Sequence, residues 1–169
     1  MICMPEPEPA ITLRPATAAD QIFLRAVFGS TREHELAALG DSPLIESFIS
    51  MQFNAQQQSY REAYAEAEDS IVLLDHNPIG RILVERSGEA IRLVNIALLT
   101  EFRGRGIGSI LLRRLLEEGA AAGKRVVLSV SKFNPAMRLY ERFGFKVAED
   151  GLYVQMQWSD FQEWPRHSI

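Results

Sequence analysis

The segment at residues 102–109 constrains the fold of this chain more than any other. It holds three glycines, at positions 104, 106 and 108, between an apolar run at 93–99 and a second apolar pattern at 110–116. Backbone without side chains at the start of a helix lets several N–H groups and the positive end of the helix dipole face one anion. The pattern therefore predicts a strand, a glycine turn and a helix, with a phosphate site at the turn.

The spacing of these glycines differs from that of two common nucleotide loops. Position 109 is Ser, so the turn does not form G-x-G-x-x-G, and no Lys followed by Ser or Thr completes a Walker-type loop. A regulator that binds ATP or NAD through this turn is therefore disfavoured.

A second motif follows the next apolar run, at residues 126–130, and contains Asn134, Ala136 and Tyr140 before Gly144 and Phe145. The two motifs occur in an order and at a separation that resemble the GNAT acyltransferase superfamily. That family has an arginine-glycine turn, [QR]-x-x-G-x-[GA], and then a helix with the pattern N-x-A-x-x-x-Y-x-x-x-G-F. The resemblance covers residues 91–158.

The resemblance implies that acetyl-CoA is the acyl donor and that its pyrophosphate lies on the turn. Residues of the preceding strand pair with the pantetheine arm, and one backbone N–H of that strand stabilises the oxyanion. The residues that this assigns to acetyl-CoA are Ile96, Ala97, Leu98, Arg103, Gly104, Arg105, Gly106, Ile107, Gly108, Ser109, Asn134 and Ala136. Asn134 followed by Pro135 also predicts a helix start without any ligand.

Tyr140 is the catalytic residue that the resemblance implies, as a hydrogen-bond donor to the departing thiolate. Relatives often use a glutamate on the strand before the turn as the base, but residues 91–96 of this chain contain no acid. Glu85 on the neighbouring strand is the first candidate, and Glu33, Glu35 or a water held by Asn95 are the alternatives. No metal is expected, because consecutive helical residues such as 33–35 point in different directions.

Length and composition indicate one domain. The chain has 169 residues, of which 47% are hydrophobic, enough for one buried core. We expect an α/β fold with a single mixed sheet flanked by helices over residues 11–158, a mobile segment at 1–10 and a tail at 159–169. The lone Cys3 and the absence of signal-peptide and membrane-spanning patterns predict a cytoplasmic protein that does not bind membranes.

The expected element order is βααβββαβαββ. Its strands are predicted at 11–15, 70–74, 79–86, 90–99, 126–131, 145–149 and 152–158, with a hairpin turn at 75–78. Its helices are predicted to begin at Asp20, near Pro43, after the glycine turn and at Asn134, and Gly123 and Gly144 end the last two.

Charge separates the two halves of the chain. Residues 1–100 carry seven Arg against 14 Asp or Glu, whereas residues 101–125 carry six basic residues against three acidic ones. This distribution favours a phosphorylated donor at the turn and a cationic amine as acceptor, either a small molecule or a protein amine. Nucleic acid would require a broader basic face. The sequence is compatible with a homodimer. The alternative to an enzyme is a non-catalytic module that senses acetyl-CoA.

Overall fold

The computed structural model of the protein describes residues 10–86 and 88–160. The expectations for Cys3 and for most of the two terminal segments, residues 1–9 and 161–169, lie outside the described residues. No helix within the described ranges is long and apolar enough to cross a membrane.

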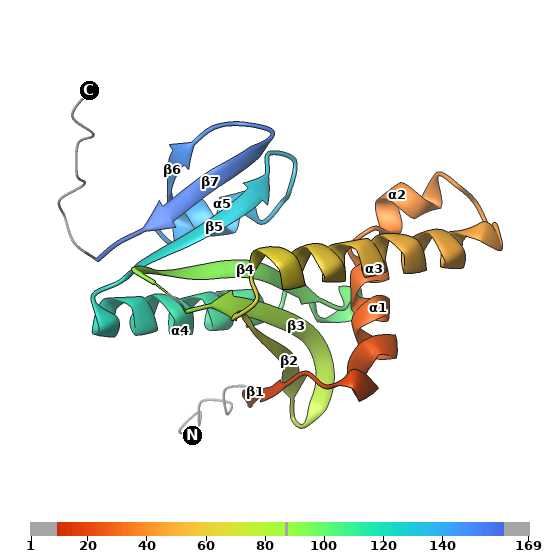
Figure 1. Cartoon of the computed structure of the whole chain (residues 1–169), viewed down its shortest axis with the longest axis horizontal. Helices are drawn as coiled ribbons and strands as arrows, with labels where there is room; N and C mark the ends of the chain where they lie inside the picture. The colour runs from red at the N-terminus through yellow and green to blue at the C-terminus, as the bar shows by residue number, and fades with distance from the viewer. Residues whose placement is uncertain (1–9, 87, 161–169) are drawn as a thin grey trace, which may run out of the picture. The chain divides into compact units, whose positions relative to one another are not determined.

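Within these ranges the chain forms a mixed seven-stranded sheet flanked by helices, which confirms the predicted fold class. The strand order is β1-β2-β3-β4-β5-β7-β6. The strands are β1 (Ile11–Pro15), β2 (Glu68–Leu74), β3 (Asn77–Glu85), β4 (Ala90–Leu98), β5 (Arg125–Ser131), β6 (Lys146–Glu149) and β7 (Tyr153–Trp158). The helices are α1 (Gln21–Ser30), α2 (Glu33–Ala37), α3 (Leu44–Ala63), α4 (Ile107–Ala122) and α5 (Met137–Arg142), with 3-10 turns η1 (Ala18–Asp20) and η2 (Thr100–Phe102) (Figure 1).

The chain divides into two compact units, and strands β3 and β4 contribute residues to both. The first unit contains the described residues 10–63 together with 69–82 and 96–104. Its core joins Leu24 and Phe28 of α1 to Phe53 of α3 and Ile71 of β2. The rings of Phe28 and Phe53 lie 5.8 Å apart at their centroids, so aromatic packing holds the two helices together.

A buried arginine also holds α3 against the first unit's strands. Arg81 on β3 is only 5% exposed. Its Nε and Nη2 atoms each donate to a carboxylate oxygen of Asp69 at 2.8 Å, and its Nη1 donates to Gln57 Oε1 at 2.6 Å. The guanidinium also lies 5.8 Å from the centroid of the Tyr60 ring. The buried charge is therefore paired and hydrogen-bonded, as a buried charge must be.

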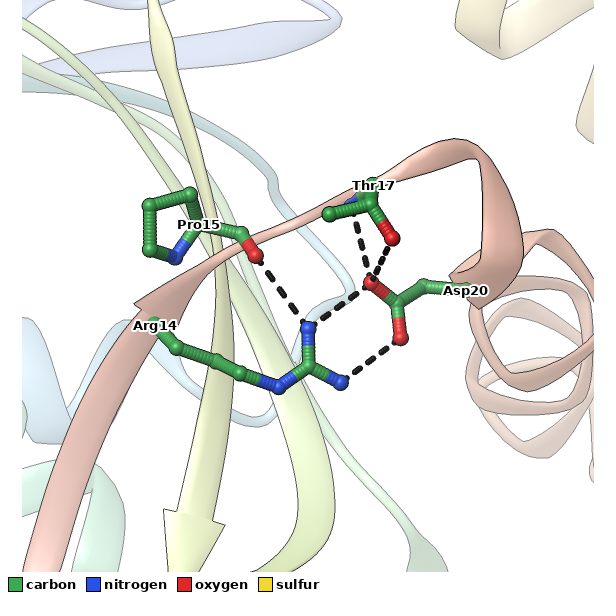
Figure 2. A network of polar contacts seen from close by, with 4 residues as sticks. All are labelled: Arg14, Pro15, Thr17 and Asp20. Atoms are coloured by element: carbon green, nitrogen blue, oxygen red, sulfur yellow. Dashed lines mark hydrogen bonds and ion pairs between the residues drawn. The ribbon is translucent and has the colours of Figure 1, made fainter.

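The entry into α1 is fixed by a second arginine (Figure 2). Arg14 donates to both carboxylate oxygens of Asp20, at 2.8 and 2.7 Å. The backbone N–H and the hydroxyl of Thr17 donate to the same carboxylate, at 2.8 and 3.1 Å. These bonds connect the end of β1 to the first turn of the helix.

The second unit contains residues 64–68 and 83–95 and the described chain from residue 105 onward. Strand β4 pairs in parallel with β5, and β7 pairs antiparallel with both β5 and β6. Helix α4 buries Leu111, Leu112, Leu115 and Leu116 along one face, the spacing that an amphipathic helix requires.

The structure corrects three local predictions. The hairpin turn is shorter than residues 75–78, because Asp75 and His76 have φ of 47° and 69° and two such residues suffice for a tight hairpin; β3 therefore begins at Asn77. Residues 33–35 were expected to be helical, but not as a helix of their own: α1 ends at Ser30 and α2 begins at Glu33 and buries no residue, so it carries no apolar period of its own. Helix α5 begins at Met137 rather than at Asn134.

Candidate active site

The glycine turn opens α4 in the way that the sequence predicts. Gly104 and Gly106 have φ of +71° and +79°, in the left-handed region that favours glycine. Gly106 is the N-cap of α4 and supplies no side-chain cap, and the first turn contains no acidic residue. The N–H groups of Ile107, Gly108 and Ser109 therefore have no acceptor within the helix.

This helix terminus is suited to an anion. The aligned peptide dipoles place a partial positive charge at the first turn, and no side-chain cap or first-turn carboxylate offsets that charge. A Cβ atom on Gly104 or Gly106 would meet no atom of the protein within 4 Å. The backbone conformation therefore favours glycine at both positions, and no contact with the protein does.

The side chain of Arg103 is directed back onto the first unit. Its Nε donates to the carbonyl oxygen of Leu98 at 2.9 Å, and its Nη2 donates to Ser30 Oγ, at the end of α1, at 3.0 Å. Two of its three nitrogens are therefore engaged with the protein. Its backbone N–H donates to the Thr100 carbonyl oxygen at 3.2 Å. The contact of Arg103 with pyrophosphate therefore stays a prediction, for which the Nη1 atom is left.

Strand β4 continues past the residues that it pairs with β5. The parallel register joins Ala90 to Arg125 and ends with Leu93 opposite Leu128, whereas β4 itself extends to Leu98. Ile96, Ala97 and Leu98 lie in this extension, in the first unit. They are the residues predicted to pair with the pantetheine arm.

Asn134 forms a turn that precedes α5. Its Oδ1 accepts the Ala136 N–H at 2.9 Å, and its carbonyl oxygen accepts the Met137 N–H at 3.1 Å. The predicted capping bond is present, but Asn134 and Pro135 lie in the turn and the regular helix starts later, with Ala136 as its N-cap. A contact of Asn134 or Ala136 with pantetheine is not tested by this geometry.

Tyr140 is buried in the second unit, with 7% of its surface exposed. Its ring meets Phe145 edge-on at a centroid distance of 5.8 Å. Burial raises the pKa of Tyr140 to about 12, because the phenolate would be poorly solvated. The hydroxyl therefore stays protonated at neutral pH and can donate a hydrogen bond.

The structure places the candidate glutamates on two elements, Glu85 on β3 and both Glu33 and Glu35 on α2. Glu85 ends β3, with its carboxylate 3.8 Å from Arg92 Nε. Glu33 accepts a hydrogen bond from Thr100 Oγ1 at 3.0 Å, and Glu35 pairs with Arg32 at 3.1 Å. Among residues 10–86 and 88–160, no hydrogen bond joins any of these glutamates to Tyr140.

Two features were missed by the sequence prediction. Ser30, the partner of Arg103, has no local signal because the two residues are 73 positions apart. Gly80 lies inside β3, where an isolated glycine marks the close approach of another backbone. Within the described ranges, no group of three or more His, Cys, Asp or Glu side chains is placed to hold a metal ion.

Comparison of sequences finds a relative over part of the chain. In sequence, the chain is 42% identical over 60 residues to mycothiol acetyltransferase of Corynebacterium aurimucosum, covering 32% of this chain and 19% of that protein. The chain thus matches only about a fifth of that relative's length.

In structure, it is similar to the PaiA N-acetyltransferase of Thermoplasma acidophilum, crystallised in complex with coenzyme A. The TM-score is 0.66 at 21% identity, covering 89% of this chain and 99% of the other. An acetyltransferase from Thermus thermophilus gives a TM-score of 0.64 at 21% identity over 88% and 96% of the two chains. These two likenesses show the fold.

A match to a family model shows which family the chain belongs to. The model described as acetyltransferase (GNAT) domain matches residues 63–147, a span that contains β4, the glycine turn, α4 and the Tyr140 helix. The chain therefore belongs to the GNAT acetyltransferase family.

Proposed function

We propose that this protein is an N-acetyltransferase that transfers the acetyl group of acetyl-CoA directly to a primary amine within a ternary complex. The observation that carries the proposal is the start of α4, where Gly106 gives the first-turn N–H groups no side-chain cap and the first turn contains no acidic residue. A pyrophosphate supplies the negative charge and the acceptors that such a terminus requires. The coenzyme A in the Thermoplasma acetyltransferase supports the same donor.

The proposed donor site uses three segments. The turn at residues 103–109 binds the pyrophosphate through backbone N–H groups. Residues 96–98 of β4 hold the pantetheine arm and the thioester. Asn134 and Ala136 contact the arm from the start of α5.

The reaction requires no covalent enzyme intermediate. The amine nitrogen forms a bond to the acetyl carbon, the C–S bond breaks, and coenzyme A leaves as a thiolate. The Tyr140 hydroxyl donates a hydrogen bond to that sulfur. Full proton transfer from a phenol of pKa about 12 to a thiolate of conjugate pKa about 8.5 would be uphill by about 5 kcal/mol. Tyr140 therefore acts as a hydrogen-bond donor, and the proton lost by the amine is the one that the product thiol regains.

The amine must lose a proton before it attacks. A lysine-like group of pKa about 10.4 is mostly charged at pH 7, and making it neutral costs about 4.6 kcal/mol. Glu85 is the first candidate for accepting this proton, because its carboxylate is largely buried, with 21% of the side chain exposed. Glu33, Glu35 and a water held by Asn95 remain the alternatives.

The experiment that tests this function is a screen of amines. The protein is incubated with acetyl-CoA and a panel of polyamines, amino-sugar amines, lysine peptides and peptides with free N-termini. Release of free thiol together with an acceptor heavier by one acetyl group is the expected result. Tight binding of acetyl-CoA without thiol release across the panel would instead identify a non-catalytic acetyl-CoA sensor.

A matched pair of glycine variants tests the donor site within the same experiment. Gly106 and Gly88 have φ of +79° and +83°, and a Cβ on either meets no protein atom within 4 Å. Alanine therefore imposes a similar backbone strain, about 1 kcal/mol, at both positions. We expect Gly106→Ala to lose acetyl-CoA affinity and Gly88→Ala to retain it; equal affinities would refute the proposed pyrophosphate site.

A further inference from the structure

Gly80 is a glycine whose position no hairpin or helix end explains. It lies within β3, and a Cβ atom at this residue would overlap the carbonyl oxygen of Ala97 and come within 2.7 Å of Leu98 Cδ2. All of these residues belong to the first unit. The end of β4 thus occupies the space that any other residue at position 80 would fill with its side chain.

The contact also orients one peptide group. The carbonyl oxygen of Ala97 is the atom nearest to the Cβ position of Gly80, and Leu98 Cα lies farther away at 3.1 Å. The carbonyl therefore points towards β3. The peptide that follows Ala97 is trans, so its N–H, which belongs to Leu98, points in the opposite direction, away from β3.

Two hydrogen bonds fix the next peptide along the chain, the one between Leu98 and Leu99. The Leu99 N–H donates to the carbonyl oxygen of Ile79 at 2.9 Å, and Arg103 Nε donates to the carbonyl oxygen of Leu98 at 2.9 Å. The end of β4 is therefore held by a contact at Gly80 and by a bond at each of the two following residues. A donor held in this way needs little reorganisation when charge develops beside it.

We propose that Gly80 is a positioning residue for the thioester: by admitting the Ala97 carbonyl, it directs the Leu98 N–H towards the acetyl carbonyl oxygen. This inference rests on the proposed function. Any side chain at position 80 displaces the end of β4 and moves the donor away from the position where the oxyanion forms. Coenzyme A keeps its pyrophosphate contacts with the turn and has no acetyl oxygen to lose, so it loses less affinity than acetyl-CoA.

The test compares Gly80→Ala with Gly119→Ala. A Cβ on Gly119 would lie 2.8 Å from Val126 Cγ2 and 3.0 Å from the Lys124 carbonyl oxygen, so this control imposes a comparable clash at the far end of α4. The probe is acetyl-CoA labelled with 13C at the thioester carbonyl, observed by infrared difference spectroscopy. Calorimetry gives the dissociation constants of acetyl-CoA and coenzyme A for each protein.

In the unchanged protein, we expect the bound carbonyl stretch to lie at lower frequency than in free acetyl-CoA. Gly80→Ala should lose this shift and bind acetyl-CoA about fivefold more weakly, the value of one hydrogen bond, with a smaller loss of coenzyme A affinity. Gly119→Ala should keep both the shift and the affinity. Retention of the shift in Gly80→Ala, or its loss in both variants, would overturn the role of Gly80.

A second measurement needs no variant and serves if Gly80→Ala does not fold. The amide proton of Leu98 should move downfield when acetyl-CoA is added to the unchanged 15N-labelled protein, and coenzyme A should not move it in that direction. A Leu98 amide that responds equally to both ligands overturns the inference while leaving donor binding intact. Failure to bind either ligand refutes the proposed function itself, and the inference with it.

Discussion

Burial of the Tyr140 ring determines what its hydroxyl can contribute. The side chain packs against Phe145, and the raised pKa of about 12 keeps the phenol protonated across the range in which an acetyltransferase operates. A hydrogen bond to sulfur strengthens only as the C–S bond breaks, so it stabilises the transition state more than the bound thioester.

Removing the Tyr140 hydroxyl tests whether it stabilises the transition state more than the bound thioester. We expect Tyr140→Phe to lower kcat by about 100-fold and to change the acetyl-CoA dissociation constant by less than about twofold. Initial rates and calorimetry measure the two quantities separately. An unchanged kcat would leave Tyr140 with a packing role alone.

The same raised pKa predicts how stability responds to alkali. Unfolded tyrosine loses its proton near pH 10, whereas Tyr140 in the folded chain retains it to about 12. The contribution to stability is present below pH 10 and is lost as the pH rises towards 12. The free energy of unfolding should therefore fall over this interval by about 2 kcal/mol more in the unchanged protein than in Tyr140→Phe. Parallel losses in urea titrations of both proteins would contradict the assignment.

The lowered pKa of Asp20 predicts a loss of stability in acid. The Arg14 guanidinium, and then the Thr17 N–H, hold the pKa of the Asp20 carboxyl well below its usual value (Figure 2). The stabilisation is present above about pH 4 and is lost as the pH falls towards the lowered pKa. We expect Asp20→Asn to melt at a lower temperature at neutral pH, and the difference from the unchanged chain to shrink below about pH 4. Thermal melts across this range that differ by a constant amount would exclude the ion pair as the cause.

At the level of elements, the corner between α1 and α2 is joined to the connection that leads from β4 to the glycine turn. Ser30 accepts from Arg103, and Glu33 accepts from Thr100. Both bonds join residues more than sixty positions apart in the chain. They hold the segment that follows β4 in the first unit.

A double-mutant cycle measures the bond between Glu33 and Thr100. We expect Glu33→Gln and Thr100→Val to destabilise the protein less in combination than the sum of their separate effects, with a coupling free energy of about 0.5 kcal/mol. Chemical denaturation of the four proteins gives the value. Strict additivity would mean that the contact contributes nothing in solution.

The elements also show what a sequence can predict. Helix α4 was predicted at both ends, because Gly106 and Gly123 have positive φ and such glycines signal locally. The break between α1 and α2 left no signal, and the start of α5 was misplaced because an Asn-Pro turn and a helix cap share the same residues. The partners of Arg103 and the neighbour of Gly80 depend on chain segments far away in sequence. Local patterns therefore predict the glycine turn but not the supports around it.

At the level of the whole molecule, charge predicts the class of acceptor. Residues 1–100 carry seven Arg against 14 Asp or Glu, and a net negative surface raises the local concentration of cations. We expect KM for a cationic amine to rise about threefold between low and high salt, because ions screen this attraction. KM for an uncharged amine should stay nearly constant. A preference for acidic acceptors at low salt would contradict the charge argument without affecting the acetyltransferase assignment.

The buried pairing of Arg81 with Gln57 favours one alignment of α3 along the strands over alignments that are shifted by one helical turn. If α3 slid by one turn, about 5.4 Å, either Phe53 or Arg61 would replace Gln57 beside the guanidinium. Phe53 would leave a donor without an acceptor, and Arg61 would bring a second positive charge into the interior. The apolar face of the helix tolerates such a slide far better than this contact does. Gln57 thus penalises misaligned packings during folding, and only the native alignment gives each nitrogen of the Arg81 guanidinium an acceptor.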